Sequence, residues 1–174
     1  SVYWFDQRSH GLIDRQSVGT ELRYLDPKFN AYAVIDYDVK FGKLNLGLLT
    51  LNYSFPDQST FSLTADYRQS PLLTTTNALI GQPVLSLGDL RDLFDDSTIY
   101  HLADDRTLVS KSVTASYSRP ISSKLQANFD VSLTDTGGTP ASGGVEAMPA
   151  TGTEYFYGVQ MVGSGMLWSN DIYI

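Results

Sequence analysis

The sequence predicts an all-β protein: an antiparallel up-and-down transmembrane β-barrel, partial, with about eight strands and a short helical segment in one long loop. Three observations predict this fold class. Polar and apolar residues alternate along several segments, as in strands whose two faces meet different surroundings. These segments run for about 10 to 13 residues, whereas soluble strands average about 5 or 6 and membrane strands need about 9 to 11. The connections between them are short at one end of the predicted strands and include two long ones at the other.

The alternation is clearest in the stretch STFSLTADYRQSP, residues 59–71. There apolar Phe61, Leu63, Ala65 and Tyr67 alternate with polar Ser62, Thr64, Asp66 and Arg68. The same pattern predicts further strands, in chain order, over residues 18–24, 31–41, 49–55, 109–117 and 125–133, and less regularly over 155–161. The phase slips at Leu48–Leu49, which predicts a β-bulge there. VYWFDQR and DIYI resemble cut strands, so we expect the chain to be a piece of a longer protein.

The connections predict which strand ends lie together. DPKF, PDQS, RPISS and SND fall at one end of the sheet, and all four are short. SHGLIDRQ, FGK, residues 70–107 and residues 135–153 fall at the other end. Outer-membrane barrels have short periplasmic turns and long outer loops, so this asymmetry favours a barrel.

The two long connections differ in composition. In residues 70–107, SLGDLRDLF predicts a short helix with Ser86 as N-cap and Asp89 at its third position, and a second helical turn begins at Ser97. We expect this loop to fold over a barrel mouth or into it. Residues 135–153 are rich in Gly, Pro, Ser and Thr, which predicts a mobile or turn-packed loop.

Alternation alone does not decide which face is enclosed. In a soluble sandwich the apolar side chains form the core; in a membrane barrel they meet lipid and the polar ones line a lumen. Strand length, loop asymmetry and aromatic placement favour the barrel. In that interpretation the lumen is lined by Glu21, Arg23, Asp36, Asp38, Lys40, Asp66, Arg68 and Asp130. A lipid-facing aromatic girdle comprises Tyr24, Phe41, Phe55, Phe61, Tyr67, Tyr117, Tyr155 and Trp168. Folding the hairpins at their turns predicts that Glu21 lies near Asp36 or Val34, Asp36 near Thr50, and Thr50 near Asp66.

Composition excludes several classes of protein. The 174 residues carry 19 acidic and 12 basic side chains, a net charge of −7, which argues against a nucleic-acid binder. The chain has no cysteine, so disulfides, thiol nucleophiles and zinc–thiolate sites are excluded. No apolar run approaches the roughly 18 residues of a membrane helix.

Catalytic motifs are not evident. His101 lies near Asp95, Asp96, Asp104 and Asp105, a pattern compatible with a cation site or a hydrolytic dyad, although a solvated acidic loop is the simpler interpretation. The glycine-rich segment GTPASGGVEAMPATGT has no following lysine and so does not form a phosphate loop. We therefore expect a non-enzyme with no catalytic residues, no metal site and no cofactor.

Several stretches carry a resemblance: GLIDRQSVGTELRY, DYDVKFGKLN, ADYRQSPLLTTTNALIGQP, LADDRT, TPASGGVEAMPATGTEYFYGVQMVGS and NDIYI. They resemble the C-terminal region of a largely uncharacterised group of proteobacterial proteins, in which tetratricopeptide-type repeats precede an outer-membrane β-barrel. The resemblance implies a single barrel domain over residues 1–174, truncated at both ends, in the bacterial outer membrane. It also implies a periplasmic repeat domain upstream and further strands downstream.

Three functions remain open at this point. The first is a porin-like export or uptake pore, or a membrane anchor for the periplasmic repeat domain, with the lipid bilayer as partner. By analogy with polysaccharide-export porins, its lumen would hold a polysaccharide or small solute. The second is a soluble β-sandwich or lipocalin-like binding module. The third is an outer-membrane barrel hydrolase that uses His101.

Overall fold

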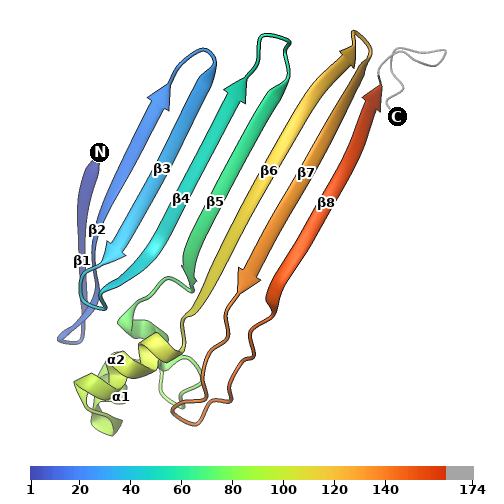
Figure 1. Ribbon diagram of the computed structural model, residues 1–174. Coiled ribbons are helices and arrows are strands. Elements are labelled where there is room, and N and C mark those ends of the chain that lie inside the picture. The colour runs from blue at the N-terminus through green and yellow to red at the C-terminus, as the bar shows by residue number, and fades with distance from the viewer. Residues whose placement is uncertain (164–174) are drawn as a thin grey trace.

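Residues 1–163, which the structure describes, form a single curved antiparallel sheet in the computed structural model (Figure 1). The eight strands follow one another in sequence order, each pairing with the next, so the predicted up-and-down topology is confirmed. The sheet is open. Its strands are β1 Val2–Ser9, β2 Leu12–Leu25, β3 Phe29–Asp38, β4 Lys43–Ser54, β5 Thr60–Ser70, β6 Leu108–Ser122, β7 Leu125–Thr136 and β8 Gly152–Gly163.

The long connection between β5 and β6 is helical. Residues 71–107, here called the cap, contain the 3₁₀ helix η1 (Thr75–Leu79) and the helices α1 (Leu87–Leu93) and α2 (Asp96–Asp105). The predicted N-cap of α1 is confirmed, because the Ser86 hydroxyl accepts from the Asp89 backbone N–H at 3.1 Å. Helix α2 begins one residue before the predicted Ser97, because the carboxylate of Asp95 caps it.

The other connections within residues 1–163 lie as the sequence predicts, whereas the predicted connection SND and the predicted strand DIYI lie outside the described residues. Short turns join β2 to β3, β4 to β5 and β6 to β7 at one end of the sheet, and the cap and residues 137–151 lie at the other end (Figure 1). Residues 137–151 are not featureless. Two isolated bridges, Thr139 with Met148 and Ser142 with Val145, fold them into a narrow turn-packed arm.

Strand register assigns the side chains to two faces. The polar face carries Glu21, Arg23, Asp36, Asp38, Asp66, Arg68 and Asp130, with Ser, Thr and Asn between them and with the aliphatic residues Val34, Leu46 and Leu48 in its β3–β4 part. The apolar face carries Leu22, Ile35, Leu49, Leu63, Val113, Val131 and Tyr157. Successive side chains of a strand alternate between these faces.

Some details of register differ from the prediction. The register shift between β3 and β4 falls at Asn45, not at Leu48–Leu49, because Tyr37 pairs with Leu44 and Asp36 with Leu46. Glu21 lies opposite Val34, one of the two predicted partners. The predicted approaches of Asp36 to Thr50 and of Thr50 to Asp66 were wrong, because both turns come earlier in the chain than we expected. Their observed partners are Leu46 for Asp36 and Thr64 for Thr50.

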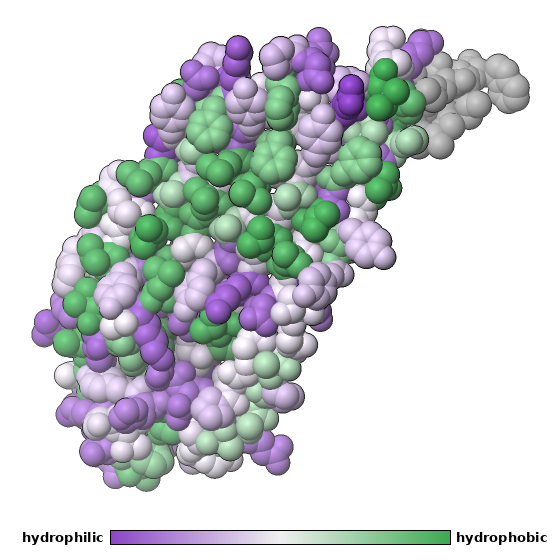
Figure 2. Space-filling view, viewed as in Figure 1, coloured by the Kyte–Doolittle hydropathy of each residue, from purple (hydrophilic) through white to green (hydrophobic). Residues whose placement is uncertain are grey.

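Burial is distributed unusually for an all-β domain. The described hydrophobic core lies in the cap, where Leu87, Leu90, Ile99 and Leu102 pack together with Leu12 of β2. Apolar side chains of the sheet are exposed instead: Leu22 is 61% and Val159 67% exposed. Figure 2 shows hydrophobic side chains gathered over the middle of the sheet, with hydrophilic ones concentrated toward its ends.

Helices of the described chain are short. None of them is long and apolar enough to cross a membrane.

Candidate functional site: the polar face and its cap

A buried carboxylate anchors the polar face at its cap end. Asp36 is 1% exposed and accepts hydrogen bonds from the Tyr3 hydroxyl at 2.9 Å, the Arg15 guanidinium at 2.9 Å and the Ser17 hydroxyl at 3.2 Å. Gly19 makes this geometry possible: a Cβ at that position would lie 2.0 Å from the Tyr3 ring. The Tyr3 ring therefore crosses β2 and reaches β3. Burying the charge of Asp36 is tolerable because it is paired and hydrogen-bonded.

Two further acidic residues of the polar face are paired along their own strands. Glu21 lies 2.6 Å from Arg23 in β2, and Asp66 accepts from Nε of Arg68 at 2.7 Å in β5. Residues two apart on a strand share a face, so each arginine cancels the charge of its neighbour. Asp130, across from Ser116, makes no ion pair among residues 1–163. Arg15, Arg23 and Arg68 thus neutralise Asp36, Glu21 and Asp66, whereas Asp38 and Asp130 are in none of the ion pairs of the described residues, so the polar face keeps a negative charge.

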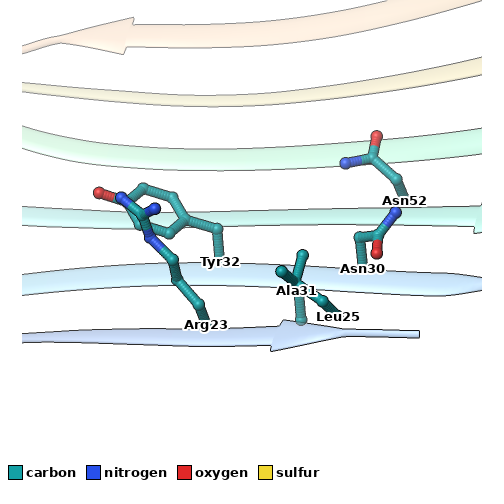
Figure 3. A pocket seen from close by; sticks show the side chains of 6 residues that line it. All are labelled: Arg23, Leu25, Asn30, Ala31, Tyr32 and Asn52. Carbon is teal, nitrogen blue, oxygen red and sulfur yellow. The ribbon is translucent and has the colours of Figure 1, made fainter.

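A hollow of about 470 Å³ lies on the polar face toward the short turns. Arg23, Asn30, Tyr32 and Asn52 contribute its polar and aromatic side chains (Figure 3). The Arg23 guanidinium lies over the Tyr32 ring, 5.1 Å from its centroid. Asn30 and Asn52 are direct cross-strand neighbours, so their amides stand side by side. The hollow therefore offers amide groups and one aromatic ring to a solute.

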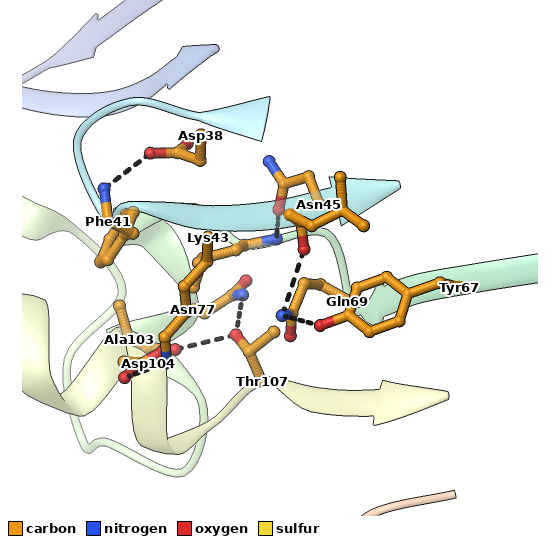
Figure 4. A network of polar contacts seen from close by, with 12 residues as sticks. Asp38, Phe41, Lys43, Asn45, Tyr67, Gln69, Asn77, Ala103, Asp104 and Thr107 are labelled. Carbon is orange, nitrogen blue, oxygen red and sulfur yellow. Dashed lines mark hydrogen bonds and ion pairs between the residues drawn. The ribbon is translucent and has the colours of Figure 1, made fainter. Parts of the chain in front are cut away.

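Buried polar contacts hold the cap against β2 and β4. The Thr76 backbone N–H donates to Asp14 at 2.8 Å, and the Leu73 N–H donates to Asn45 at 3.2 Å. Within the cap, the Asn77 amide donates to the Thr107 hydroxyl at 2.8 Å (Figure 4). Asp14 and Asn45 are buried by this docking. The cap therefore covers the end of the polar face nearest to it.

Lys40 lies at the centre of the contact between the cap and the sheet. The alternation predicts it within a strand, and this prediction is wrong because β3 ends at Asp38. It follows the end of β3, and its ammonium donates to the carbonyl of Ile13 and, at 2.8 Å, to Thr75 Oγ1. The ammonium also lies 3.3 Å from the centroid of the Tyr100 ring. Burial lowers the pKa of Lys40 to about 8, against the opposing effect of nearby carboxylates. One side chain thus joins β2, η1 and α2.

The predicted aromatic girdle is largely on one face. Tyr24, Phe61, Tyr67, Tyr117 and Tyr155 belong to the apolar face by register. Near the short turns, ring centroids lie 4.7 Å apart for Tyr53–Phe55, 6.3 Å for Phe55–Tyr117 and 6.5 Å for Tyr117–Phe129. Tyr53 and Phe129 were not predicted as members of this group.

Phe41 is a correction to that prediction, and Trp168 lies outside the described residues. Phe41 packs against the hydrophobic core of the cap and meets the Tyr100 ring edge-on, with 6.1 Å between the centroids. The strand ends at Asp38, so Phe41 belongs to a turn and its ring is free to point into the cap.

His101 and the possible metal ligands can be placed in the described part of the chain. The exposed His101 ring on α2 makes no hydrogen bond to a carboxylate within residues 1–163. No group of three or more His, Asp or Glu side chains in the same range is arranged to hold a metal ion.

Tyr3, Arg15 and Ser17 are partners of Asp36 that the sequence does not predict. SHGLIDRQ is predicted as a connection, whereas β2 already begins at Leu12. A bulge at Asp14, where Gln7 pairs with Arg15 and Arg8 with Ile13, interrupts the alternation that would have revealed the strand. The charged pair Asp14 and Arg15, directly before QSVGTEL, is the sequence feature that could have indicated polar contacts at this end of the strand.

These features define a class of protein: an antiparallel all-β sheet with an exposed apolar face, a charged polar face that is partly neutralised by internal ion pairs, and a helical cap at one end. No protein-family model, curated protein or solved structure matches this chain.

Proposed function

We propose that the sheet is part of the wall of a bacterial outer-membrane β-barrel, with its apolar face toward lipid and its polar face toward a lumen. The observation that carries the proposal is the inverted burial of neighbouring residues. Ile35 is 46% exposed, whereas Asp36, the next residue, is 1% exposed. At this pair of positions the apolar residue meets the surroundings and its charged neighbour is enclosed, the reverse of a soluble sheet. Arg23 and Arg68, farther from Asp36 on the same polar face, have side chains that are 66% and 56% exposed in the open sheet.

The extent of the apolar face supports a lipid environment. Large apolar patches are rare on soluble monomers, and apolar surface left in water forgoes about 25 cal/mol per Å². The alternative, a soluble sandwich or lipocalin-like module, needs a layer that covers this face, and residues 1–163 form only one sheet. Aromatic rings near the short turns suit a membrane–water boundary.

The polar face supports a channel for a polysaccharide or another small hydroxylated solute. Internal pairing of Glu21 with Arg23 and of Asp66 with Arg68 reduces the charge on this face, and Asp38 and Asp130 leave it moderately negative. The amides and the Tyr32 ring of the 470 Å³ hollow are suited to hydroxyl groups and apolar sugar faces. A barrel that does not conduct would instead serve as the membrane anchor of a periplasmic repeat domain.

Ion selectivity in a planar bilayer tests the lumen assignment. We expect a weak preference for cations in the wild type, because Asp38 and Asp130 are not neutralised by the ion pairs of the polar face. Arg68→Ala leaves Asp66 unpaired and shifts the reversal potential toward cations, and the double variant Asp66→Ala/Arg68→Ala returns close to wild type. Lys124→Ala, in the turn between β6 and β7, serves as the charge-removal control.

If Arg68→Ala leaves the ion selectivity unchanged, the assignment of the polar side of β5 to the lumen is wrong. A protein that inserts but passes no current would support the anchor role over the pore.

A further inference from the structure

A second hollow lies on the apolar face, between β3 and β6. Its volume is about 510 Å³, and its side-chain walls are almost entirely apolar. It lies on the opposite side of the sheet from the 470 Å³ hollow. Because it opens on the face that we assign to lipid, it is separate from any solute path.

Small residues form the floor of this hollow. Gly47 lies opposite Ile35 on β3 and Tyr67 on β5. Ala65 lies opposite Leu49 on β4 and, on β6, opposite Val113. Larger side chains therefore surround two positions that have almost no side chain. The result is a trough that runs across neighbouring strands, which are spaced about 4.8 Å apart.

One end of the trough carries a cation. Lys111 lines the hollow, three residues into β6 from the end nearest the cap, and it points to the apolar face beside Tyr67. Asp135 is its cross-strand neighbour on β7, but the two make no ion pair of 4 Å or less in the described chain. A lysine on a lipid-facing surface extends its ammonium toward the membrane–water boundary.

We propose that this trough binds one anionic phospholipid, with an acyl chain over Gly47 and Ala65 and the headgroup phosphate on the Lys111 ammonium. The inference rests on the proposed function, because it requires the apolar face to meet a bilayer. An acyl chain complements an apolar trough, and a phosphodiester complements an unpaired ammonium close to the boundary. The hollow, the two small residues and the Lys111 ammonium occur together here, which distinguishes this position from ordinary lipid contact.

Lipid binding to the full chain in detergent tests the proposal, with phosphatidylglycerol and phosphatidylcholine as probes and native mass spectrometry as the readout. We expect one retained phosphatidylglycerol, bound about fivefold or more tightly than phosphatidylcholine. Lys111→Gln should remove that preference, since it removes the charge and keeps the length. Ala65→Leu should weaken both lipids by filling the trough. Asp135→Asn should strengthen phosphatidylglycerol binding by removing a competing carboxylate.

Two matched controls lie on the same face of β6. Arg119→Gln removes a cation near the short turns, and Ala115→Leu enlarges a small residue outside the trough. Both should bind phosphatidylglycerol as the wild type does. Equal binding of both lipids, or equal losses in the controls and in Lys111→Gln, overturns the site.

Insertion into phosphatidylcholine vesicles separates this failure from failure of the proposed function. A protein that inserts but shows no preference among lipids refutes only the lipid site. A protein that does not enter vesicles and stays monomeric in plain buffer refutes both.

Discussion

Gly19 on β2 has a steric role that its position in a strand does not reveal. Its missing side chain is replaced by the Tyr3 ring, which passes over β2 to reach Asp36. The polar face thus contains a bond between β1 and β3, two strands that do not pair with each other. A glycine within a strand often marks such a close approach.

Gly19→Val should therefore destabilise the sheet. The new side chain displaces the Tyr3 ring and removes one donor from a carboxylate that stays buried, which we expect to cost about 1–3 kcal/mol. Urea unfolding of the protein in detergent measures this cost. Tyr3→Phe keeps the ring and removes only the hydroxyl, so its loss should be smaller, about 1 kcal/mol. Equal stability of Gly19→Val and wild type would contradict the role of Gly19.

At the scale of elements, the cap is a small folded unit attached to the sheet through a few polar side chains. Its core is its own apart from Leu12 and the Phe41 ring that packs against it, and Lys40 connects the two parts. Attachment through a partly buried lysine makes docking depend on pH. Burial has lowered the pKa of Lys40 from 10.5 to about 8, and undocking returns the ammonium to water.

Docking of the cap should strengthen as the pH rises through 8. Between about 8 and 10.5 the docked lysine has lost its proton and the undocked lysine keeps it. The docked state then binds fewer protons, so raising the pH favours it. Hydrogen exchange of residues 71–107, corrected for the intrinsic rate, should show more protection at pH 9.5 than at pH 7.5.

Lys40→Met should flatten this dependence, whereas Lys43→Met should retain it. Lys43 makes an exposed ion pair with Asp104, 2.7 Å away, which contributes little to docking. The same slope in wild type and Lys40→Met would assign the pH dependence to another group.

Elements with local signals were predicted well from the sequence. The strands follow from alternation, and α1 follows from Ser86 and Asp89, because both signals lie within a few consecutive residues. The bulges at Asp14 and Asn45 and the docking of Lys40 and Phe41 were not predicted. They depend on contacts between residues that are far apart in the chain, and alternation carries no information about such contacts.

In the candidate site, too, the local features were predicted from the sequence and the contacts between distant residues were not. Alternation placed Glu21, Arg23, Asp66 and Arg68 on one face, and the structure adds that they neutralise one another. The burial of Asp36 depends on the Tyr3 ring of β1, and no residue spacing along β3 predicts that contact.

At the scale of the whole molecule, the two faces of the sheet carry different kinds of side chain. Ala115 lies at the centre of the long strand β6 and points to the apolar face, opposite Leu63 and Val131. Ser116, the next residue, points to the polar face, opposite Asp130. These two positions differ in environment although they are adjacent in the chain.

Ala115→Arg and Ser116→Arg therefore form a matched pair. In a bilayer, arginine at the midplane on the lipid side should cost about 2–4 kcal/mol, whereas on the polar face it meets Asp130 and should be tolerated. Folding yield and urea unfolding in phosphatidylcholine vesicles measure both. Equal costs for the two variants, or a larger cost for Ser116→Arg, would place the apolar face somewhere other than in lipid.

The cap also has a consequence for the order in which the molecule assembles. Its core comes almost wholly from one contiguous stretch of chain, so it can condense before any distant strands meet. Once condensed, it brings the ends of β5 and β6 together and spares that hairpin the entropy of closing a long open loop. Pairing would then start in the middle of the sheet and spread outward to β1 and β8, with the cap as the nucleus.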